Sequence, residues 1–254
     1  MISAAGFAKA LSYWKLFLQG VACTVSLSLL TVLFGFVLAL VLAVCRLGRS
    51  RILKLIASVY VEIIRATPMV VQVFIIFYVV FNGVKVLPNY KLFGFIRFDR
   101  FFPAVVALSL NSGAYLCEII RSGIQSIDGG QTEAARSLGL TQAQNMRFII
   151  LPQAIKNILP AIANEFVTII KESSICYTIG VQEIMYAVAS VKGATYRIGE
   201  PLIIATLVYF CLTFPTSKII EHFEKKMSVG DHRNSGDEIS REHERRAKSK
   251  VNKV

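Results

Sequence analysis

The feature that most constrains the fold is an uncharged run near the N-terminus. No charged residue occurs between Lys15 and Arg46. About 20 apolar residues in a helix cross the hydrocarbon core of a bilayer, so this run is long enough to span it. The run is too long for the apolar core of a cleavable signal, which is about 7–15 residues, so we expect it to be retained. Charged residues make up only 17% of the chain, against about 25% in soluble domains. An integral membrane protein is therefore predicted.

Five apolar blocks predict an all-α fold with five transmembrane helices. The blocks are approximately Gly20–Cys45, Leu55–Phe81, Phe102–Ile120, Pro152–Ile175 and Pro201–Ile220. Thr67-Pro68 lies inside the second block, where the proline predicts a bend or a break. Pro103 and Pro152 are expected at the starts of the third and fourth spans. A shorter apolar piece, Ile179–Val191, predicts a re-entrant or surface helix on the outer side.

The basic residues predict the orientation and the domain limits. The first connection carries four cations and no acid, which places it in the cytoplasm, the N-terminus outside and the C-terminus inside. This orientation places four other cations outside, namely Lys85, Lys91, Arg97 and Arg100, which argues against it. The orientation is kept, because these residues are spread along a loop and Asp99 offsets one of them. We expect an external or interfacial segment at 1–19, a transmembrane domain at 20–226 and a charged cytoplasmic tail at 227–254, mobile or loosely helical.

Several classes of function are disfavoured. The net charge of +12 comes from cations beside apolar blocks, with no nucleic-acid-binding motif. The five cysteines are scattered without a CxxC pair, so neither a metal site nor another cofactor is predicted. No G-x-x-x-x-G-K-[ST] phosphate loop is present, so any ATP must be hydrolysed by a separate subunit.

The most specific pattern is Glu-Ala-Ala, three residues, Gly, nine residues, then Ile-x-Leu-Pro, in the second predicted cytoplasmic loop, residues 128–152. It is filled by Glu133, Ala134, Ala135, Gly139, Ile149, Leu151 and Pro152. We expect Thr132 to cap a short helix that carries Glu133 in its first turn, and Thr141 to cap the next helix. The two alanines would present a low surface to another protein, and Gly139 would allow a turn.

This pattern resembles the EAA loop of the permease subunits of ATP-binding-cassette (ABC) importers. Segments Val61–Gln72, Leu110–Arg121 and Asn164–Ser174 are similar to the polar amino-acid branch of these permeases, and the resemblance covers about residues 15–226. It implies a type I, MetI-like permease in the cytoplasmic membrane, with no catalytic activity. It also implies a coupling helix between the third and fourth spans. The implied partners are two ATPase subunits, a second permease, an external solute-binding protein, the lipid bilayer and an amino-acid substrate.

Ionisable residues within the spans are costly, about 2.5–3.5 kcal/mol each, so each needs a partner, water or substrate. Glu165, Thr168 and Glu172 share one face of the fourth span, with Lys171 beside them. Such a set can bind a zwitterion or hold helices together. The candidate pathway residues are Asn111, Tyr115, Glu118, Glu165, Thr168, Lys171 and Glu172. Glu62 with Arg65, and Glu118 with Arg121, are expected to pair within their helices.

Two alternatives remain open. The EAA loop also occurs in permeases for sugars, metals and anions, so the solute could belong to another class. An intramembrane enzyme using Glu165 and Glu172 is the second alternative. The three histidines all lie near or in the tail, away from these carboxylates, which disfavours the enzyme.

Overall fold

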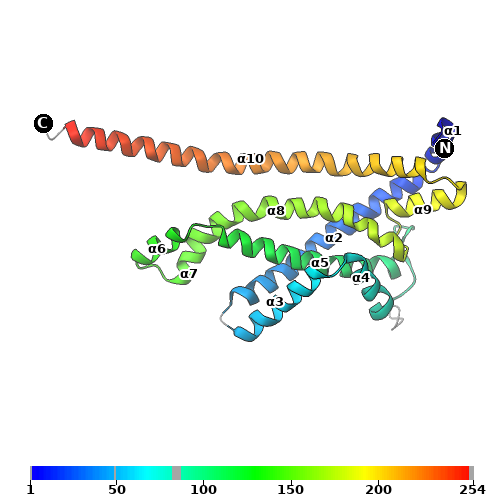
Figure 1. Cartoon of the computed structure of the whole chain (residues 1–254), viewed down its shortest axis with the longest axis horizontal. Coiled ribbons are helices and arrows are strands. Elements are labelled where there is room, and N and C mark those ends of the chain that lie inside the picture. Colours follow the sequence, from blue (N-terminus) through cyan, green and yellow to red (C-terminus); the bar gives the residue numbers. More distant parts are fainter. Residues whose placement is uncertain (1, 49, 82–86, 252–254) are drawn as a thin grey trace.

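The computed structural model describes residues 2–48, 50–81 and 87–251, with side chains described up to residue 226. Nearly all of this part is helical (Figure 1). The helices are α1 (Ala4–Leu11), α2 (Trp14–Leu47), α3 (Arg51–Ala66), α4 (Met69–Phe74), the π-helix η1 (Ile75–Phe81), α5 (Phe98–Gln125), α6 (Gly129–Ser137), α7 (Gln142–Asn145), the π-helix η2 (Met146–Ile150), α8 (Leu151–Glu172), the 3-10 helix η3 (Ser173–Ile179), α9 (Ile184–Thr195) and α10 (Gly199–Val251). Strands β1 (Lys91–Leu92) and β2 (Ile96–Arg97) form an antiparallel hairpin.

The helices long and apolar enough to cross a membrane number four in the described residues, or five with the bent pair. The four are Trp14–Leu47, Phe98–Gln125, Gln142–Ile179 and Gly199–Lys226. The bent pair joins α3 to the helix Met69–Phe81, and its axis turns by 108°. The break falls at Thr67-Pro68 and confirms the interruption expected there.

One expected helix start is wrong, and two helices extend past the limits of the apolar blocks. The chain enters α5 directly from strand β2, so α5 begins at Phe98 and Pro103 lies inside the helix rather than at its start. α2 begins at Trp14, so residue 20 falls within a helix. α10 runs without interruption from Gly199 to Val251, so the polar end of the chain is helical, which is one of the two forms expected for it. Lys, Arg and Glu, which are good helix formers, account for 10 of residues 227–254.

The main contact of the bundle is between α2 and α5, where small residues allow close approach. A Cβ added at Gly35 would lie 3.1 Å from Ser112 and 3.3 Å from the Gly113 nitrogen. A Cβ added at Gly113 would lie 2.7 Å from Leu38. Association of helices in lipid depends on such packing, because lipid tails remove the hydrophobic drive between helices. These glycines therefore set the spacing of the two central helices.

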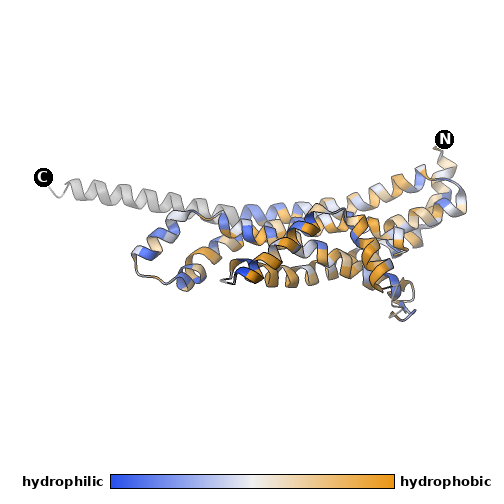
Figure 2. Cartoon of the chain, turned by 60° about the horizontal axis from the view of Figure 1, so that its bottom comes forward, coloured by the Kyte–Doolittle hydropathy of each residue, from blue (hydrophilic) through white to orange (hydrophobic). Residues whose placement is uncertain are grey.

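The two ends of the molecule differ in structure. α6 and α7 form one end, while α1, α9 and the hairpin lie at the other (Figure 1). Apolar residues dominate the bundle between them, and α6 is largely hydrophilic (Figure 2). The apolar piece after the fourth span is the short helix α9, which buries Ile184, Ala187, Val188 and Val191 against α2 and α10.

Candidate functional site

The EAA segment folds as a compact pair of short helices at one end of the bundle. Asp128 caps α6 by accepting a hydrogen bond from the Gly130 N–H at 2.8 Å. The expected capping role of Thr132 is wrong, because α6 begins three residues earlier at Gly129. The Thr132 hydroxyl instead accepts from the Asn145 amide at 3.2 Å and ties α6 to α7. Glu133 consequently lies beyond the first turn, where the helix dipole contributes little.

The exposed surface of this loop differs in part from the expected one. Glu133 and Ala134 are exposed, but Ala135 is buried and packs within the loop, which corrects its expected place on the surface. Leu138 is 80% exposed. Gly139 follows with φ of +81°, so the turn expected there is confirmed and lies in the left-handed region that favours glycine. The loop therefore presents a small alanine and a projecting leucine.

The second half of the loop leads directly into the fourth span. Thr141 caps α7 in a capping box with Gln144, as predicted. The helical backbone then continues from Gln142 through η2 into α8, where Pro152 occupies the first turn of α8 as expected. Ile149 is half-buried, and Leu151 and Pro152 are exposed. A displacement of this loop would thus be passed directly to α8, whose internal Pro160 is a point at which the helix can bend.

The candidate pathway residues of α8 lie between its buried and exposed sides. Glu165, Thr168 and Glu172 are half-buried, and Lys171 is exposed. Glu165 interacts electrostatically with Glu172, and Glu172 with Lys171. Among the described residues, Lys171 forms no ion pair with either carboxylate. The Thr168 hydroxyl donates to the Asn164 carbonyl at 3.2 Å. The charged groups of α8 are therefore close together without neutralising one another in direct pairs.

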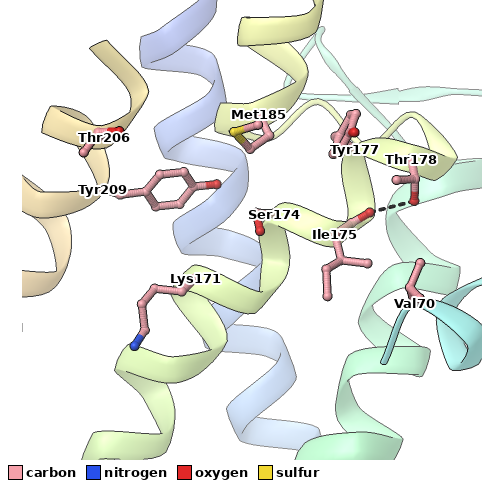
Figure 3. A pocket seen from close by; sticks show the side chains of 9 residues that line it. All are labelled: Val70, Lys171, Ser174, Ile175, Tyr177, Thr178, Met185, Thr206 and Tyr209. Atoms are coloured by element: carbon pink, nitrogen blue, oxygen red, sulfur yellow. Dashed lines mark hydrogen bonds between the residues drawn. The ribbon is translucent and has the colours of Figure 1, made fainter. Parts of the chain in front are cut away.

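A cavity of about 480 Å³ lies beside the end of α8. Figure 3 shows Tyr209 and Ser174 on opposite walls, with the Lys171 amine at the cavity edge and pointing away from them. Five of the nine lining residues carry a hydroxyl, three are aliphatic and one is a lysine; they come from α4, α8, η3, α9 and α10: Val70, Lys171, Ser174, Ile175, Tyr177, Thr178, Met185, Thr206 and Tyr209. Its size and lining are typical of a small-molecule site.

Asn111 is buried and belongs to a clamp at the break in the second span. Its side-chain amide donates to the side-chain oxygen Oε1 of Gln72 at 2.9 Å. The Gln72 amide donates in turn to the carbonyls of Ile64 and Thr67, at 2.7 and 3.1 Å, and to the Thr67 hydroxyl. These carbonyls lose helical partners at the break, so Gln72 replaces hydrogen bonds that the bend removes. Sequence reasoning did not single out Gln72.

Glu118 bridges two helices near the end of the bundle that carries α6. It accepts from Arg46 of α2 at 2.8 Å and from Arg121 within α5, which confirms the expected Glu118–Arg121 pair. The expected Glu62–Arg65 pair is wrong, because Arg65 lies over the ring of Tyr115, with 5.5 Å between the guanidinium carbon and the ring centroid. Both oxygens of Glu118 are occupied, so this arrangement supports a structural role for it.

Replacing Glu118 by glutamine is expected to destabilise the protein. The change leaves Arg46 and Arg121 without their counter-charge, a loss of about 1–3 kcal/mol for partly buried groups. A lower midpoint of thermal unfolding in detergent would show this. Glu62→Gln is the matched control, since Glu62 is exposed and should unfold at the wild-type temperature. Equal midpoints for the two variants would contradict the bridging role.

Sequence reasoning missed a buried carboxylate, Glu183, which lies behind the cavity-lining residue Tyr209. Glu183 has no exposed surface, caps α9 through the Tyr186 N–H at 2.8 Å and accepts from the Tyr209 hydroxyl at 2.8 Å. The sequence signal was an acidic residue directly before an apolar helix. Through Tyr209, Glu183 joins α9 to α10 and fixes one wall of the cavity.

Comparison with known proteins agrees with this geometry. The chain belongs to the family described as binding-protein-dependent transport system inner membrane component, whose family model matches residues 32–229. The arginine transport system permease protein ArtQ of Bacillus subtilis is 42% identical over 214 residues, which are 84% of this chain and 93% of the relative. The L-cystine transport system permease protein TcyB of the same organism is 36% identical over 219 residues, 85% of this chain and 88% of the relative.

Solved structures share the fold. A crystal structure of an amino acid ABC transporter with histidines superposes with a TM-score of 0.81 at 40% identity, covering 89% of this chain and 100% of that chain. The methionine ABC transporter MetNI, in an inward-facing form, gives 0.67 at 18% identity, covering 84% and 97%. The chain is thus a multi-pass inner-membrane permease with the MetI-like fold and no catalytic role. Its family pairs such subunits with an ATPase and a solute-binding protein.

Proposed function

We propose that this chain forms the translocation pathway for a polar amino acid and couples it to ATP hydrolysis by partner subunits. The arginine and L-cystine permeases, and the putative glutamine transport system permease protein GlnP of Rickettsia conorii at 38% identity, support this class of solute. The resemblance of the segments around Gln72, Asn111 and Glu165 to the same branch agrees with it.

The observation that carries the proposal is the course of α8. This helix begins at the EAA loop and brings Glu165, Lys171 and Glu172 into the interior of a span. Charged groups in a membrane face water or partners, because hydrocarbon does not solvate them. An amino acid offers both an ammonium and a carboxylate, which can replace the hydration of these side chains. Asn111, Tyr115 and Thr168 add polar groups on the neighbouring faces.

The proposed arrangement in the membrane has five spans, with the bent pair α3 and α4–η1 counted as one. The N-terminus is outside and the C-terminus in the cytoplasm, as the basic first connection indicates. Residues 1–19 form the external or interfacial segment, 20–226 the transmembrane domain and 227–254 the cytoplasmic tail. The loop 128–152, with α6 as coupling helix, then faces the cytoplasm and an ATPase subunit.

In the proposed cycle, two permease subunits, identical or similar, enclose the pathway and each binds one ATPase subunit. ATP-driven closure of the ATPases draws the coupling helices together. The continuous helix from Gln142 to Glu172 carries this displacement to the polar stripe of α8, and the cavity changes from inward-facing to outward-facing. Hydrolysis resets it. The exposed Ala134 and Leu138 are the proposed contacts with the ATPase.

The test is to purify the chain with its associated subunits and measure ATPase stimulation by candidate binding proteins across the amino acids. We expect stimulation by at least one amino acid. Stimulation only by a sugar, metal or anion would replace the proposed solute class. Turnover of a lipid or peptide by the purified chain without any ATPase would instead favour an intramembrane enzyme.

A further inference from the structure

Two aromatic side chains stand out from the protein surface in an unusual backbone conformation. Tyr196 and Phe93 are 95% and 85% exposed, the highest values among the large apolar residues of the described part. Their φ angles are 56° and 52°, and within the same part no other non-glycine residue has positive φ. Bulky residues rarely adopt this conformation, because the Cβ crowds the backbone.

Phe93 projects from the tip of the hairpin. The Phe95 N–H closes the turn by donating to the Leu92 carbonyl at 3.2 Å, and Phe93 and Gly94 both have positive φ. This combination is typical of a type I′ turn, which favours Asn-Gly in its centre. Leu92 and Phe95 pack against the apolar core, so the hairpin is anchored while Phe93 is not covered. The fold alone therefore favours asparagine at position 93.

Tyr196 projects from the end of α9. Its N–H donates to the Lys192 carbonyl at 2.8 Å and closes the helix in the left-handed conformation, where glycine predominates. The turn after it is held by Arg197, which pairs with the buried Glu200 at 2.7 Å and donates to Ser3 of the N-terminal segment. The fold alone favours glycine at position 196.

Both side chains belong to the end of the molecule opposite α6 (Figure 1). Each has a lysine nearby, Lys91 beside Phe93 and Lys192 in the last turn before Tyr196. Neither lysine forms an ion pair among the described residues. This end of the molecule thus presents two exposed aromatic side chains, each near a lysine that forms no ion pair among the described residues. At the α6 end, Leu138 is also highly exposed, but its own φ is −82° and the left-handed residue is the following Gly139.

We propose that the external solute-binding protein docks on the surface formed by Phe93, Tyr196, Lys91 and Lys192. This inference rests on the proposed function and its orientation. Backbone strain persists where the surroundings enforce it and commonly marks functional sites. Exposed aromatics are typical anchors of protein interfaces. The complementary surface of the binding protein should therefore offer apolar pockets bordered by acidic residues, since the two lysines lack counter-charges on the permease.

The sharpest test uses substitutions that the backbone favours. Phe93→Asn and Tyr196→Gly remove the side chains while suiting the turn and the helix end. We expect unfolding temperatures equal to or above the wild type, and unchanged ATPase activity without binding protein. The concentration of loaded binding protein that half-saturates ATPase stimulation should rise about tenfold or more for each variant. The assay uses the permease–ATPase complex in nanodiscs, with a binding protein that stimulates the wild type.

Leu138→Asn is the matched control at the other end of the molecule. It should lower the ATPase rate at every concentration of binding protein and leave half-saturation unchanged. The inference would be overturned if the Phe93→Asn/Tyr196→Gly double variant needed the same concentration of binding protein as the wild type for half-saturation. That result would leave the proposed function standing. If no binding protein stimulates the wild type, the proposed function itself fails, and this inference fails with it.

A second measurement separates docking from anchoring in the membrane interface. Tryptophan is placed at position 93 or 196 in a Trp14→Phe background, which removes the sole native tryptophan. Quenching of its fluorescence by the loaded binding protein supports docking. Quenching by brominated lipids, with no response to the binding protein, would identify membrane anchors and overturn the proposal.

Discussion

Replacing Gly139 by valine is expected to lower ATP-driven uptake at least tenfold. Gly139 has φ of +81° and nothing lies within 4 Å of an added Cβ, so the effect comes from the backbone and not from a clash. A β-branched residue in this conformation costs roughly 1–3 kcal/mol. The loop relieves that cost by giving up the hydrogen bonds from Gly139 to Arg136 and from Leu140 to Ala135. α6 then shifts relative to α7.

Two control variants isolate this effect. Gly139→Asn should retain most uptake, because asparagine tolerates the left-handed conformation. Gly193→Val adds the same side chain to an exposed glycine of α9 that also has open space around it, and should change uptake little. Uptake and ATPase rate are measured in proteoliposomes at equal protein content. Wild-type uptake by Gly139→Val would mean that the loop geometry is not needed for coupling.

Replacing Glu165 or Glu172 by glutamine is expected to reduce uptake by about tenfold, through a higher KM for the substrate. Both carboxylates are half-buried within a span and interact with each other. Glutamine keeps the volume and removes the charge that would hold a substrate ammonium. A tenfold change corresponds to about 1.4 kcal/mol, which is modest for the loss of one charged contact.

The measurement is uptake of labelled amino acid at equal membrane expression. Glu221→Gln is the control, because this carboxylate is on the exposed side of α10 and forms an ion pair with the exposed Lys218. Its uptake should match the wild type. If both Glu165→Gln and Glu172→Gln transport with unchanged rate and KM, these residues act only between helices.

Features with a local physical cause could be predicted from the sequence. Thr67-Pro68 breaks a helix because proline lacks the donor and collides with the preceding turn. Thr141 with Gln144 forms a capping box from residues three positions apart. The uncharged run after Lys15 could only be a long helix in lipid. In each case the interacting groups are neighbours in the chain, and their spacing was visible.

What could not be predicted depends on pairs far apart in the chain. Glu118 meets Arg46 across 72 residues, and Asn111 meets Gln72 across 39. The hairpin before Phe98 starts α5 earlier than Pro103 suggested. The α6 cap was misplaced because Asp128, a better N-cap than Thr132, starts the helix before Thr132 is reached. The spacing of residues along the chain does not show which helices are neighbours. The partners of charged residues on other helices could therefore be identified only from the structure.

The broken second span has a consequence for how the chain enters the membrane during synthesis. The helix after the break has only 6 residues in α4 and 7 in η1, too few to cross a bilayer unaided. Its polar bend is completed by Asn111, which leaves the ribosome 39 residues after Gln72. Until α5 has been synthesised, Gln72 therefore lacks its Asn111 partner, and we expect the second span to reach its final bent form only after α5 has entered the membrane.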